Sequence, residues 1–549
     1  MGLQKKGNGM KSGSQRGKSI GTRLRFCLAM ALTASTVLTA NATGAKPKTI
    51  PAVKQWNEGS GSFLLAPSSR IVVDQKSVSA LTATAEVFAS DVSNLSGWKL
   101  PVSAGRPRSG DIYLRLSPVE AGMGAEGYKA VISERIEISA LTDAGVFYGT
   151  RTLLQLFAQS RVVRRGVIRD WPDYRERGLM VDVGRKYYSV QWLENQIRDL
   201  AYQKLNYLHL HLSDNLGFRI ESETHPELNK NTSPCYAKAE MRMLVALGKQ
   251  YHVTIIPELE LLAHADPILA VHPELRLVGR NGEALADKMD LSLPATRALV
   301  SDLLNEYLKL FPGRYWAAGA DEYLHPGEYA DFPQLQAYAR ARWGPAATGI
   351  DTFLGYVNWM DGVVKAHGKA VRTWGDPYEF LAYTGRAVGL NKDIVLEPWN
   401  GLVNPQEMIR AGYTITNANF RPLYYILGNS PPDAKEIYEK WAPNLEFGKE
   451  GQWSVDKRDP HLRGAKFFIW SDTPSALSED EVADRTQNCI RGVAQNTWGS
   501  QKLVSSYAEF ADVIHVLGRA PGWGKAAGPI AVTPIFSAVR STSKSKSHS

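Results

Sequence analysis

The chain has 549 residues, of which 44% are hydrophobic and 22% charged, as expected of a folded protein with more than one domain and not of a disordered or fibrous one. Its formal net charge of +9 comes mostly from residues 1–42, where seven Lys and Arg side chains have no acidic counterpart, so the remainder carries only about +2. A chain this close to neutrality gives no electrostatic reason to expect nucleic acid as a partner.

Residues 1–42 have the pattern of a secretory signal peptide. A basic stretch ends at Arg25, an apolar run covers residues 26–38, and Ala40-Asn41-Ala42 fits a small-residue cleavage site. The alternative is an uncleaved membrane anchor, but the run is short and contains Thr and Ser, so it would span a bilayer poorly. We therefore expect a secreted protein, extracellular or at the cell surface, with no transmembrane segment in its mature form. The Lys- and Ser-rich end, residues 525–549, is expected to form a disordered tail.

Residues 50–168 predict a small α+β domain. Helical periodicity covers residues 80–95 and 143–160, and strand patterns cover 69–74, 111–116, 128–132 and 135–139. The last two strand patterns flank Ser133-Glu134 and indicate a hairpin. No pattern typical of catalysis occurs in this segment, which is expected to support the rest of the chain.

Residues 171–518 show a different sequence pattern. Eight short apolar runs alternate with helical patterns such as those at 190–203, 237–251 and 295–311. The runs cover residues 178–183, 207–212, 254–259, 315–320, 370–374, 394–399, 413–417 and 466–470. Strands that alternate with helices form parallel sheets, and eight repeats predict a closed (β/α)₈ barrel. An open doubly wound sheet is the alternative.

Polar and aromatic side chains lie where most of these predicted strands end, which is where barrel enzymes carry their active sites. They are Asp182, Arg185, His211, Asp214, Glu258, Glu260, His264, Asp321, Glu322, Trp374, Trp399, Trp470 and Asp472. Two cysteines, Cys235 and Cys489, remain outside the predicted signal peptide, and the sequence leaves open whether they pair. No metal-site spacing or nucleotide fingerprint occurs, so no metal and no organic cofactor is expected.

The adjacent carboxylates Asp321 and Glu322 fit glycoside cleavage of a particular kind, although such a pair alone is not specific for it. Neighbouring side chains of a strand point to opposite faces, so two adjacent acids would not naturally flank one glycosidic bond. Adjacency suits a division of labour in which Glu322 protonates the leaving group and Asp321 holds a substrate group that is itself the nucleophile. A 2-acetamido group can act in this way, in the substrate-assisted variant of the reaction.

The surrounding motifs resemble those of family 20 glycoside hydrolases, the β-N-acetylhexosaminidases. Residues 319–322 (GADE) resemble the family's Gly-x-Asp-Glu motif, and residues 177–185 (RGLMVDVGR), 204–214 (KLNYLHLHLSD) and 257–264 (PELELLAH) resemble its first three barrel strands. Residues 145–155 (GVFYGTRTLLQ) are similar to the end of its N-terminal domain. The resemblance covers nearly all of the chain after the predicted signal peptide.

The resemblance implies a role for each candidate residue. Asp321, Glu322 and a tyrosine after strand seven are the implied catalytic groups, with Tyr424 preferred over Tyr425 to bind the acetamido oxygen. A raised pKa is expected for Glu322, from burial and from the neighbouring Asp321 charge. The remaining implied roles are sugar hydroxyl binding by Arg185, support of the acid by Asp214 and His264, and walls around the sugar formed by Trp374, Trp399 and Trp470.

Two positions depart from the family pattern and leave the substrate open. Many members have an Asp where this chain has Ile426, and a Glu where it has Asp472; both acids contact outer hydroxyls of the sugar. The predicted function is a retaining exo-hydrolase that removes β-linked GlcNAc or GalNAc from glycans. A lacto-N-biosidase that releases a Gal-GlcNAc disaccharide is the alternative, for which Gln191 is a candidate contact. A non-catalytic carbohydrate-binding protein is a remote third.

Overall fold

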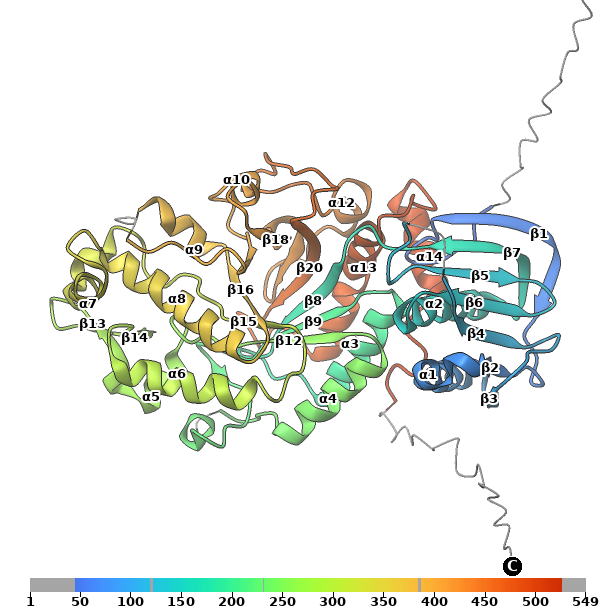
Figure 1. Cartoon of the computed structure of the whole chain (residues 1–549), viewed down its shortest axis with the longest axis horizontal. Coiled ribbons are helices and arrows are strands. Elements are labelled where there is room, and N and C mark those ends of the chain that lie inside the picture. Colours follow the sequence, from blue (N-terminus) through green and yellow to red (C-terminus); the bar gives the residue numbers. More distant parts are fainter. Residues whose placement is uncertain (1–44, 119–121, 231, 384–386, 526–549) are drawn as a thin grey trace, which may run out of the picture. The chain divides into compact units, whose positions relative to one another are not determined.

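The computed structural model describes residues 45–118, 122–230, 232–383 and 387–525 (Figure 1). The predicted signal peptide lies outside these residues, as does nearly all of the predicted tail, and both remain predictions. Within the described ranges, no helix combines the length and the apolar character needed to cross a membrane. Cys235 and Cys489 are both free thiols.

The N-terminal part of the described chain is built around a seven-stranded mixed sheet, as the α+β prediction required. Its strand order is β1-β7-β5-β6-β4-β2-β3, and helices α1 (Val78–Ser96) and α2 (Asp143–Gln159) pack against it and against each other. The strands are β1 (Gln55–Leu64), β2 (Ile71–Val73), β3 (Val102–Ala104), β4 (Ile112–Leu116), β5 (Tyr128–Ile132), β6 (Ile136–Ala140) and β7 (Val162–Asp170). The predicted hairpin is the antiparallel pair β5–β6.

Strands β1 and β7 were not expected from the sequence. They pair antiparallel at the edge of the sheet, and an irregularity between Glu58 and Ser62 interrupts their register. That irregularity falls in the Gly- and Ser-rich stretch of β1, whose composition is typical of a turn and not of a strand.

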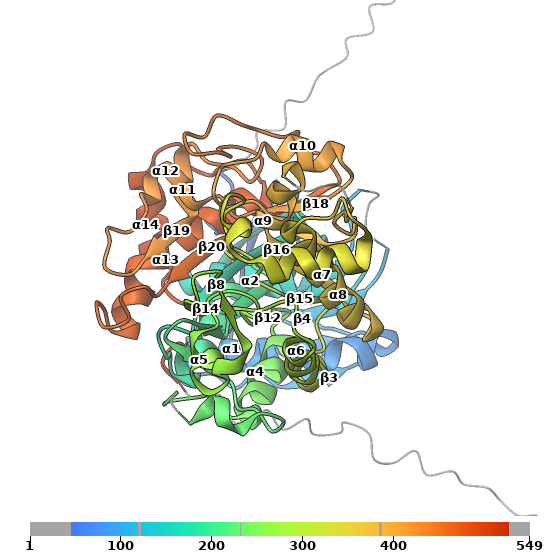
Figure 2. The ribbon, with the colours of Figure 1, turned by 90° about the vertical axis from the view of Figure 1, so that its left-hand side faces the viewer.

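The barrel prediction is confirmed, since eight parallel strands form a closed ring in which β18 pairs with both β17 and β20. This closure excludes the open doubly wound sheet. The strands are β8 (Glu176–Asp182), β9 (Tyr207–His211), β12 (Thr254–Glu258), β15 (Tyr315–Ala317), β16 (Ala370–Trp374), β17 (Val395–Glu397), β18 (Thr414–Asn417) and β20 (Leu462–Trp470). In Figure 2, β8, β12, β15 and β16 lie near the centre, with α5, α6, α8 and α13 around them.

Helices of very different length connect the strands. The longer ones are α3 (Val190–Tyr202), α4 (Lys238–Gln250), α6 (Pro294–Tyr307), α7 (Pro333–Trp343), α8 (Gly349–Ala366), α13 (Glu479–Trp498) and α14 (Tyr507–Leu517). The shorter ones are α5 (Asp266–Val271), α9 (Asp376–Glu379), α10 (Pro405–Arg410), α11 (Phe420–Leu423) and α12 (Ala434–Glu439). Local signals set the ends of α13, which begins with a capping box of Ser478 and Glu481 and ends at Gly499 in the left-handed conformation.

Several short elements complete the loops beyond the strands' C-terminal ends. A short strand, β19 (Tyr424–Ile426), pairs with β20. The loop after β9 contains the pair β10 (Ser213–Asp214) and β11 (Gly217–Phe218), and the hairpin β13 (Arg276–Val278) and β14 (Ala284–Met289) follows α5. The 3₁₀ turns in these loops are η2 (Pro226–Asn229), η3 (Pro273–Leu275), η4 (Glu328–Asp331) and η5 (Phe380–Ala382).

The interior of the barrel contains a continuous series of buried charged and imidazole side chains. Arg372 contacts Glu176 at 2.7 Å and Glu397 at 2.6 Å, and Lys466 joins Glu397 to His209, at 2.7 and 2.8 Å. We call this set, which continues through Glu258 and His211, the interior charge series: Glu176, Arg372, Glu397, Lys466, His209, Glu258, His211 and Asp214. All eight side chains are buried, and the series ends at the active-site face.

Hydrogen bonds join the N-terminal sheet to the barrel at the strands' N-terminal ends. Lys204, just before β9, donates to Asp170 of β7 at 2.7 Å, and Arg177 of β8 pairs with Glu126 at 2.9 Å. Trp498 of α13 donates its indole N–H to the same Asp170 at 2.8 Å. These contacts support the barrel from the end opposite to the one that carries the predicted site.

Candidate active site

Ten of the predicted site residues line one cavity of about 310 Å³ at the C-terminal ends of the barrel strands. They are Arg185, Asp214, His264, Asp321, Glu322, Trp374, Trp399, Tyr424, Trp470 and Asp472. The cavity is also lined by Asn400 and Phe420, which the sequence did not single out, and by Ile426. Side chains from the C-terminal ends of all eight barrel strands, or from the loops that follow them, therefore line one cavity, as the barrel requires.

Two predicted residues lie outside this cavity. Tyr425 is fully buried behind it, because Tyr424 and Ile426 take the cavity face of β19 and the residue between them points the other way. Gln191 lies in the first turn of α3, where its amide donates to the backbone oxygen of Lys525 at 3.0 Å. Neither side chain therefore lines the cavity in which the sugar is expected to bind.

The backbone after β15 brings the two adjacent carboxylates to the same cavity. The strand ends at Ala317, and left-handed φ angles follow at Gly319 (60°), Ala320 (72°) and Glu322 (45°). Such angles are uncommon for residues with a side chain and concentrate at functional sites. Glycine is favoured at 319 by its positive φ and because a Cβ atom there would clash with the carboxylate of Glu260.

Asp321 and Glu322 occupy different environments, and the pKa expectation for Glu322 was wrong. The Glu322 side chain is 56% exposed, and its hydrogen bond to His264 holds the pKa of this carboxyl below its usual range. The Asp321 side chain is only 15% exposed, and burial raises its pKa. Adjacency in sequence could not show that the charge of His264 reaches Glu322 while Asp321 is the buried member of the pair.

His264 connects Glu322 to the interior of the barrel. Its Nε2 lies 3.4 Å from Glu322 and 3.7 Å from Asp321, and its Nδ1 lies 3.4 Å from Asp214. Burial alone would lower the pKa of His264, but the hydrogen bond to Glu322 and the charge of Asp321 outweigh it and the pKa is raised. The resulting row Asp214–His264–Glu322 can hold a proton next to the acid.

Arg185 anchors the opposite side of the cavity. Its guanidinium contacts Asp214 at 2.9 Å and Asp182 at 3.0 Å, and lies over the ring of Trp470. These two carboxylates fix the guanidinium while leaving part of it at the cavity surface, where it can bind a sugar hydroxyl.

Asp376 is a member of the site that the sequence reasoning missed. Its carboxylate accepts hydrogen bonds from the Trp399 indole at 2.8 Å and from the Glu322 backbone N–H at 3.2 Å. Burial, followed by the charge of Asp321, raises the pKa of Asp376 to about 7. It therefore positions both the acid and one aromatic wall. The sequence signal that could have identified Asp376 is its position two residues after Trp374, at the end of a strand.

The walls of the cavity are aromatic, and several polar atoms of its lining residues have no hydrogen-bond partner. Trp470 packs against Trp374 and Tyr424, with ring centroids 5.6 and 5.7 Å apart. Within the described part of the chain, Tyr424 Oη, Trp374 Nε1, Trp470 Nε1 and Asp321 Oδ1 are buried without a hydrogen-bond partner. Burial raises the pKa of Tyr424 well above its ordinary value, so this hydroxyl stays protonated and remains a donor. Unsatisfied buried groups of this kind indicate a polar ligand.

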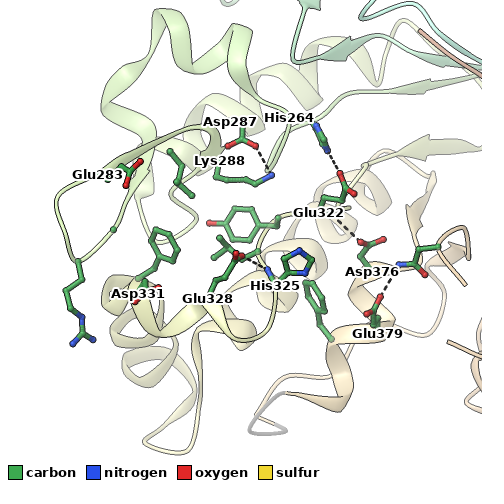
Figure 3. A pocket seen from close by; sticks show the side chains of 18 of the residues that line it. His264, Glu283, Asp287, Lys288, Glu322, His325, Glu328, Asp331, Asp376 and Glu379 are labelled. Atoms are coloured by element: carbon green, nitrogen blue, oxygen red, sulfur yellow. Dashed lines mark hydrogen bonds and ion pairs between the residues drawn. The ribbon is translucent and has the colours of Figure 1, made fainter. Parts of the chain in front are cut away.

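A second, larger cavity of about 970 Å³ adjoins the first and shares His264, Glu322, Trp399 and Asn400 with it (Figure 3). The hairpin β13–β14, the loop after β15 and α9 provide its lining. Charged side chains surround it, among them Asp287, Lys288, Glu328, Asp331 and Glu379. Glu322 lies where the two cavities meet. A substrate whose glycosidic bond lies beside the Glu322 carboxyl would therefore occupy both cavities, one on each side of that bond.

A barrel with paired carboxylates and an aromatic cavity at its C-terminal strand ends has the architecture of a glycoside-cleaving enzyme. Residues 174–505 match the family model for the catalytic domain of glycosyl hydrolase family 20, and residues 46–171 match domain 2 of that family. The chain therefore belongs to glycosyl hydrolase family 20.

Similarity to individual proteins agrees with this assignment. The chain is 30% identical to the lacto-N-biosidase of Bifidobacterium bifidum over 86% of this chain and 42% of that one, so it spans less than half the length of that relative. It is 25% identical to the β-N-acetylhexosaminidase of Cellulomonas fimi, over 76% of this chain and 83% of that one. The chitobiase structure from Flavobacterium johnsoniae shares the fold, with a TM-score of 0.70 at 21% identity, over 86% of this chain and 72% of that one.

Proposed function

We propose that this protein is a retaining glycoside hydrolase that releases β-linked N-acetylhexosamine, GlcNAc or GalNAc, from the non-reducing ends of glycans. The observation that carries this proposal is the pair of unpartnered groups Tyr424 Oη and Asp321 Oδ1 in the first cavity. One is a donor and the other an acceptor, as the C=O and N–H of an acetamide require. A sugar without the 2-acetamido group would leave both buried groups unsatisfied.

The reaction follows from this placement. Tyr424 donates to the acetamide oxygen and holds it for attack on the anomeric carbon, while Asp321 accepts the acetamide N–H and stabilises the charge that develops on nitrogen. Glu322 protonates the glycosidic oxygen as the bond to the anomeric carbon breaks, which leaves a bicyclic oxazolinium ion. Glu322 then takes a proton from water, the water oxygen attacks the anomeric carbon, and the sugar departs with its β configuration retained.

The second cavity supports a polar leaving group beyond the scissile bond. Glu322 lies at its edge, and its lining offers carboxylates together with Arg280 and Lys288 for sugar hydroxyls. Its volume is about three times that of the first cavity, so the leaving group is a glycan of more than one sugar in this proposal.

Tyr424→Phe tests the acetamide contact, with Tyr425→Phe as a matched control on the same strand. The first change removes the donor from the cavity and should lower kcat/KM on an aryl N-acetylglucosaminide by about 10²-fold. The second removes a hydroxyl that does not reach the cavity, so steady-state kinetics should stay near wild type. Equal losses in both variants would contradict the assignment of Tyr424.

The pH dependence tests the contact between His264 and Glu322. A general acid must be protonated to act, so activity falls as pH rises through its pKa. His264→Gln removes the imidazole whose hydrogen bond and charge hold the pKa of Glu322 down, and the basic limb of kcat/KM should therefore move to higher pH. The control is His325→Gln in the second cavity, which should leave the profile in place. A basic limb that stays fixed or moves to lower pH in His264→Gln would refute this coupling.

Release of a Gal-GlcNAc disaccharide is a second candidate, favoured by the identity of two lining residues. Ile426 provides no polar contact, and Asp472 places its carboxylate about 1.5 Å further back than a Glu would. Relative to the Asp and Glu that many family members carry, both residues offer fewer contacts to the outer hydroxyls of a single sugar, so the cavity encloses that sugar less tightly. The 30% identity to a protein named lacto-N-biosidase points in the same direction. Aryl GlcNAc, aryl GalNAc and aryl lacto-N-bioside, compared by catalytic efficiency, decide between the candidates.

The double variant Ile426→Asp, Asp472→Glu tests the role of these two lining residues, which we call the rim of the first cavity. It restores the two acids that many family members carry, so it should raise the ratio of monosaccharide to disaccharide release by about 10-fold or more, the contribution of one hydrogen bond to a charged group. Ile426→Asn, Asp472→Gln supplies similar shapes without charge and should give a smaller change. A ratio that falls in the double variant would show that these positions do not form the rim. If the wild-type protein hydrolysed none of the three aryl glycosides, the result would instead favour a non-catalytic carbohydrate-binding protein.

We further propose that the protein is secreted, on the strength of the signal-peptide pattern in residues 1–42. Amino-terminal sequencing of protein collected outside the cells should give a first residue just after Ala42. Recovery of the intact amino terminus from the membrane fraction would contradict cleavage.

A further inference from the structure

A group of two imidazoles and one carboxylate lies outside both cavities. His225 directly precedes η2, Glu227 belongs to η2, and His272 lies between α5 and η3, so the loop after β9 and the loop after β12 both contribute. His225 Nδ1 and His272 Nε2 each lie 3.0 Å from the same oxygen, Glu227 Oε1. We call this group the His225–Glu227–His272 cluster; its side chains are 17–28% exposed.

Neutral imidazoles do not supply enough protons for the contacts of this cluster. His272 also has its Nδ1 3.1 Å from Glu274, so both ring nitrogens face carboxylate oxygens, which only accept hydrogen bonds. A neutral imidazole has one N–H and can satisfy one of these contacts. His225 Nε2 lies 3.5 Å from Asp302 and is buried without a hydrogen-bond partner in the described residues.

A divalent cation bound among the three inner atoms resolves this mismatch. Each histidine then binds the ion through the nitrogen that faces Glu227 and carries its proton on the other nitrogen, toward Glu274 or Asp302. Carboxylates behind metal-binding histidines are the usual way in which such ligands are oriented. Zinc–ligand bonds of about 2.1 Å at tetrahedral angles place ligand atoms about 3.4 Å apart, close to the 3.0 Å between each imidazole nitrogen and Glu227 Oε1.

We propose that the His225–Glu227–His272 cluster binds one zinc ion, with water as the fourth ligand. Two imidazoles and a carboxylate favour zinc over calcium, which takes oxygen ligands. The backbone of each histidine is already fixed, since the His225 N–H donates to Ser222 Oγ at 3.0 Å and the His272 N–H donates to the Ile268 carbonyl at 2.9 Å. The backbone that carries each imidazole is therefore held in place before the ion binds.

The consequence for the enzyme is structural. The ion joins the loop after β9 to the end of α5, and α5 begins two residues after His264. Zinc in this position steadies the segment that carries the histidine beside the acid. It does not touch the substrate, so it supports the active site without taking part in the reaction.

The full-length protein, treated with chelator and dialysed, is titrated with zinc chloride by calorimetry, and its metal content is measured by mass spectrometry. We expect one equivalent of zinc to bind and no uptake of calcium chloride. His272→Ala should lower the zinc affinity by at least about 100-fold, and Glu274→Gln, which alters only the residue behind His272, by about 10-fold. His515→Ala, at an exposed position of α14, is the matched control and should bind zinc like the wild type.

A thermal readout keeps the test independent of hydrolysis. Zinc in about 100-fold excess over its Kd should raise the Tm of the wild type and of His515→Ala by roughly 3 °C, and should leave His272→Ala unchanged. Circular dichroism checks that the variants fold. The proposal is overturned if the wild type takes up no zinc, or if His272→Ala binds it as tightly as the wild type; the cluster is then a set of ion pairs between protonated histidines and carboxylates.

Discussion

Replacing Glu322 by Gln is expected to lower kcat/KM on N-acetylhexosaminides with poor leaving groups by about 10²–10⁴-fold, the usual contribution of a general acid. The amide has the shape of the carboxyl group but cannot deliver its proton to the glycosidic oxygen. Substrate affinity should change little, because the Glu322 side chain lies at the junction of the cavities and more than half of it is exposed. Steady-state kinetics on a leaving-group series provide the measurement.

The leaving-group series also identifies the step that is lost. A nitrophenol leaving group needs little protonation, so Glu322→Gln should retain much more of its activity on such a substrate than on a sugar leaving group. Glu407→Gln, at an exposed position of α10 that lines neither cavity, is the control and should follow the wild type across the series. Near-wild-type turnover of a sugar leaving group by Glu322→Gln would remove this residue from the role of acid.

Replacing Asp321 by Asn is expected to lower kcat/KM by about 10²–10³-fold on good and poor leaving groups alike, because it acts on the nucleophile and not on the leaving group. The substitution puts a neutral amide where the oxazolinium ion needs an anion. A thiazoline mimic of that ion should bind the wild type tightly and the variant much more weakly, since an inhibitor that resembles the intermediate gains most from the charge.

The control for this change is Asp331→Asn, an acid of the second cavity that is not adjacent to the acetamide site. It should leave thiazoline inhibition unaltered. A covalent sugar adduct on any side chain, trapped and detected by mass spectrometry, would contradict the substrate-assisted route.

The fold was largely accessible from the sequence because its strands are short, buried on both sides and separated by amphipathic helices. β1 and β7 were missed for the opposite reason. One contains Gly59 and Gly61, and the other has Arg164 and Arg165 beside Gly166. β1 is the edge strand of the sheet and β7 lies next to it, and hydrophobic alternation is weak in both sequences. Pairing between segments so distant in the chain leaves no local signal.

The sequence predicted the site residues whose positions depend on where a strand ends. It did not predict those whose positions depend on the conformation of a loop. The carboxylate pair and the tryptophans follow directly from the positions of their strands. Asp376 depends on the turn after β16, and the place of Gln191 outside the cavity depends on where α3 begins; periodicity specifies neither. The lowered pKa of Glu322 depends on an imidazole from a different strand end, a contact that only the folded chain creates.

The interior charge series bears on where this protein can work. Its members lie inside the barrel, away from mobile ions, and the Debye screening that weakens exposed ion pairs does not reach them. Removing one partner by mutation would leave an uncompensated buried charge at a cost of about 3–5 kcal/mol. Added salt should weaken these pairs far less than it weakens exposed ones, so the contacts at the centre of the barrel should depend little on ionic strength.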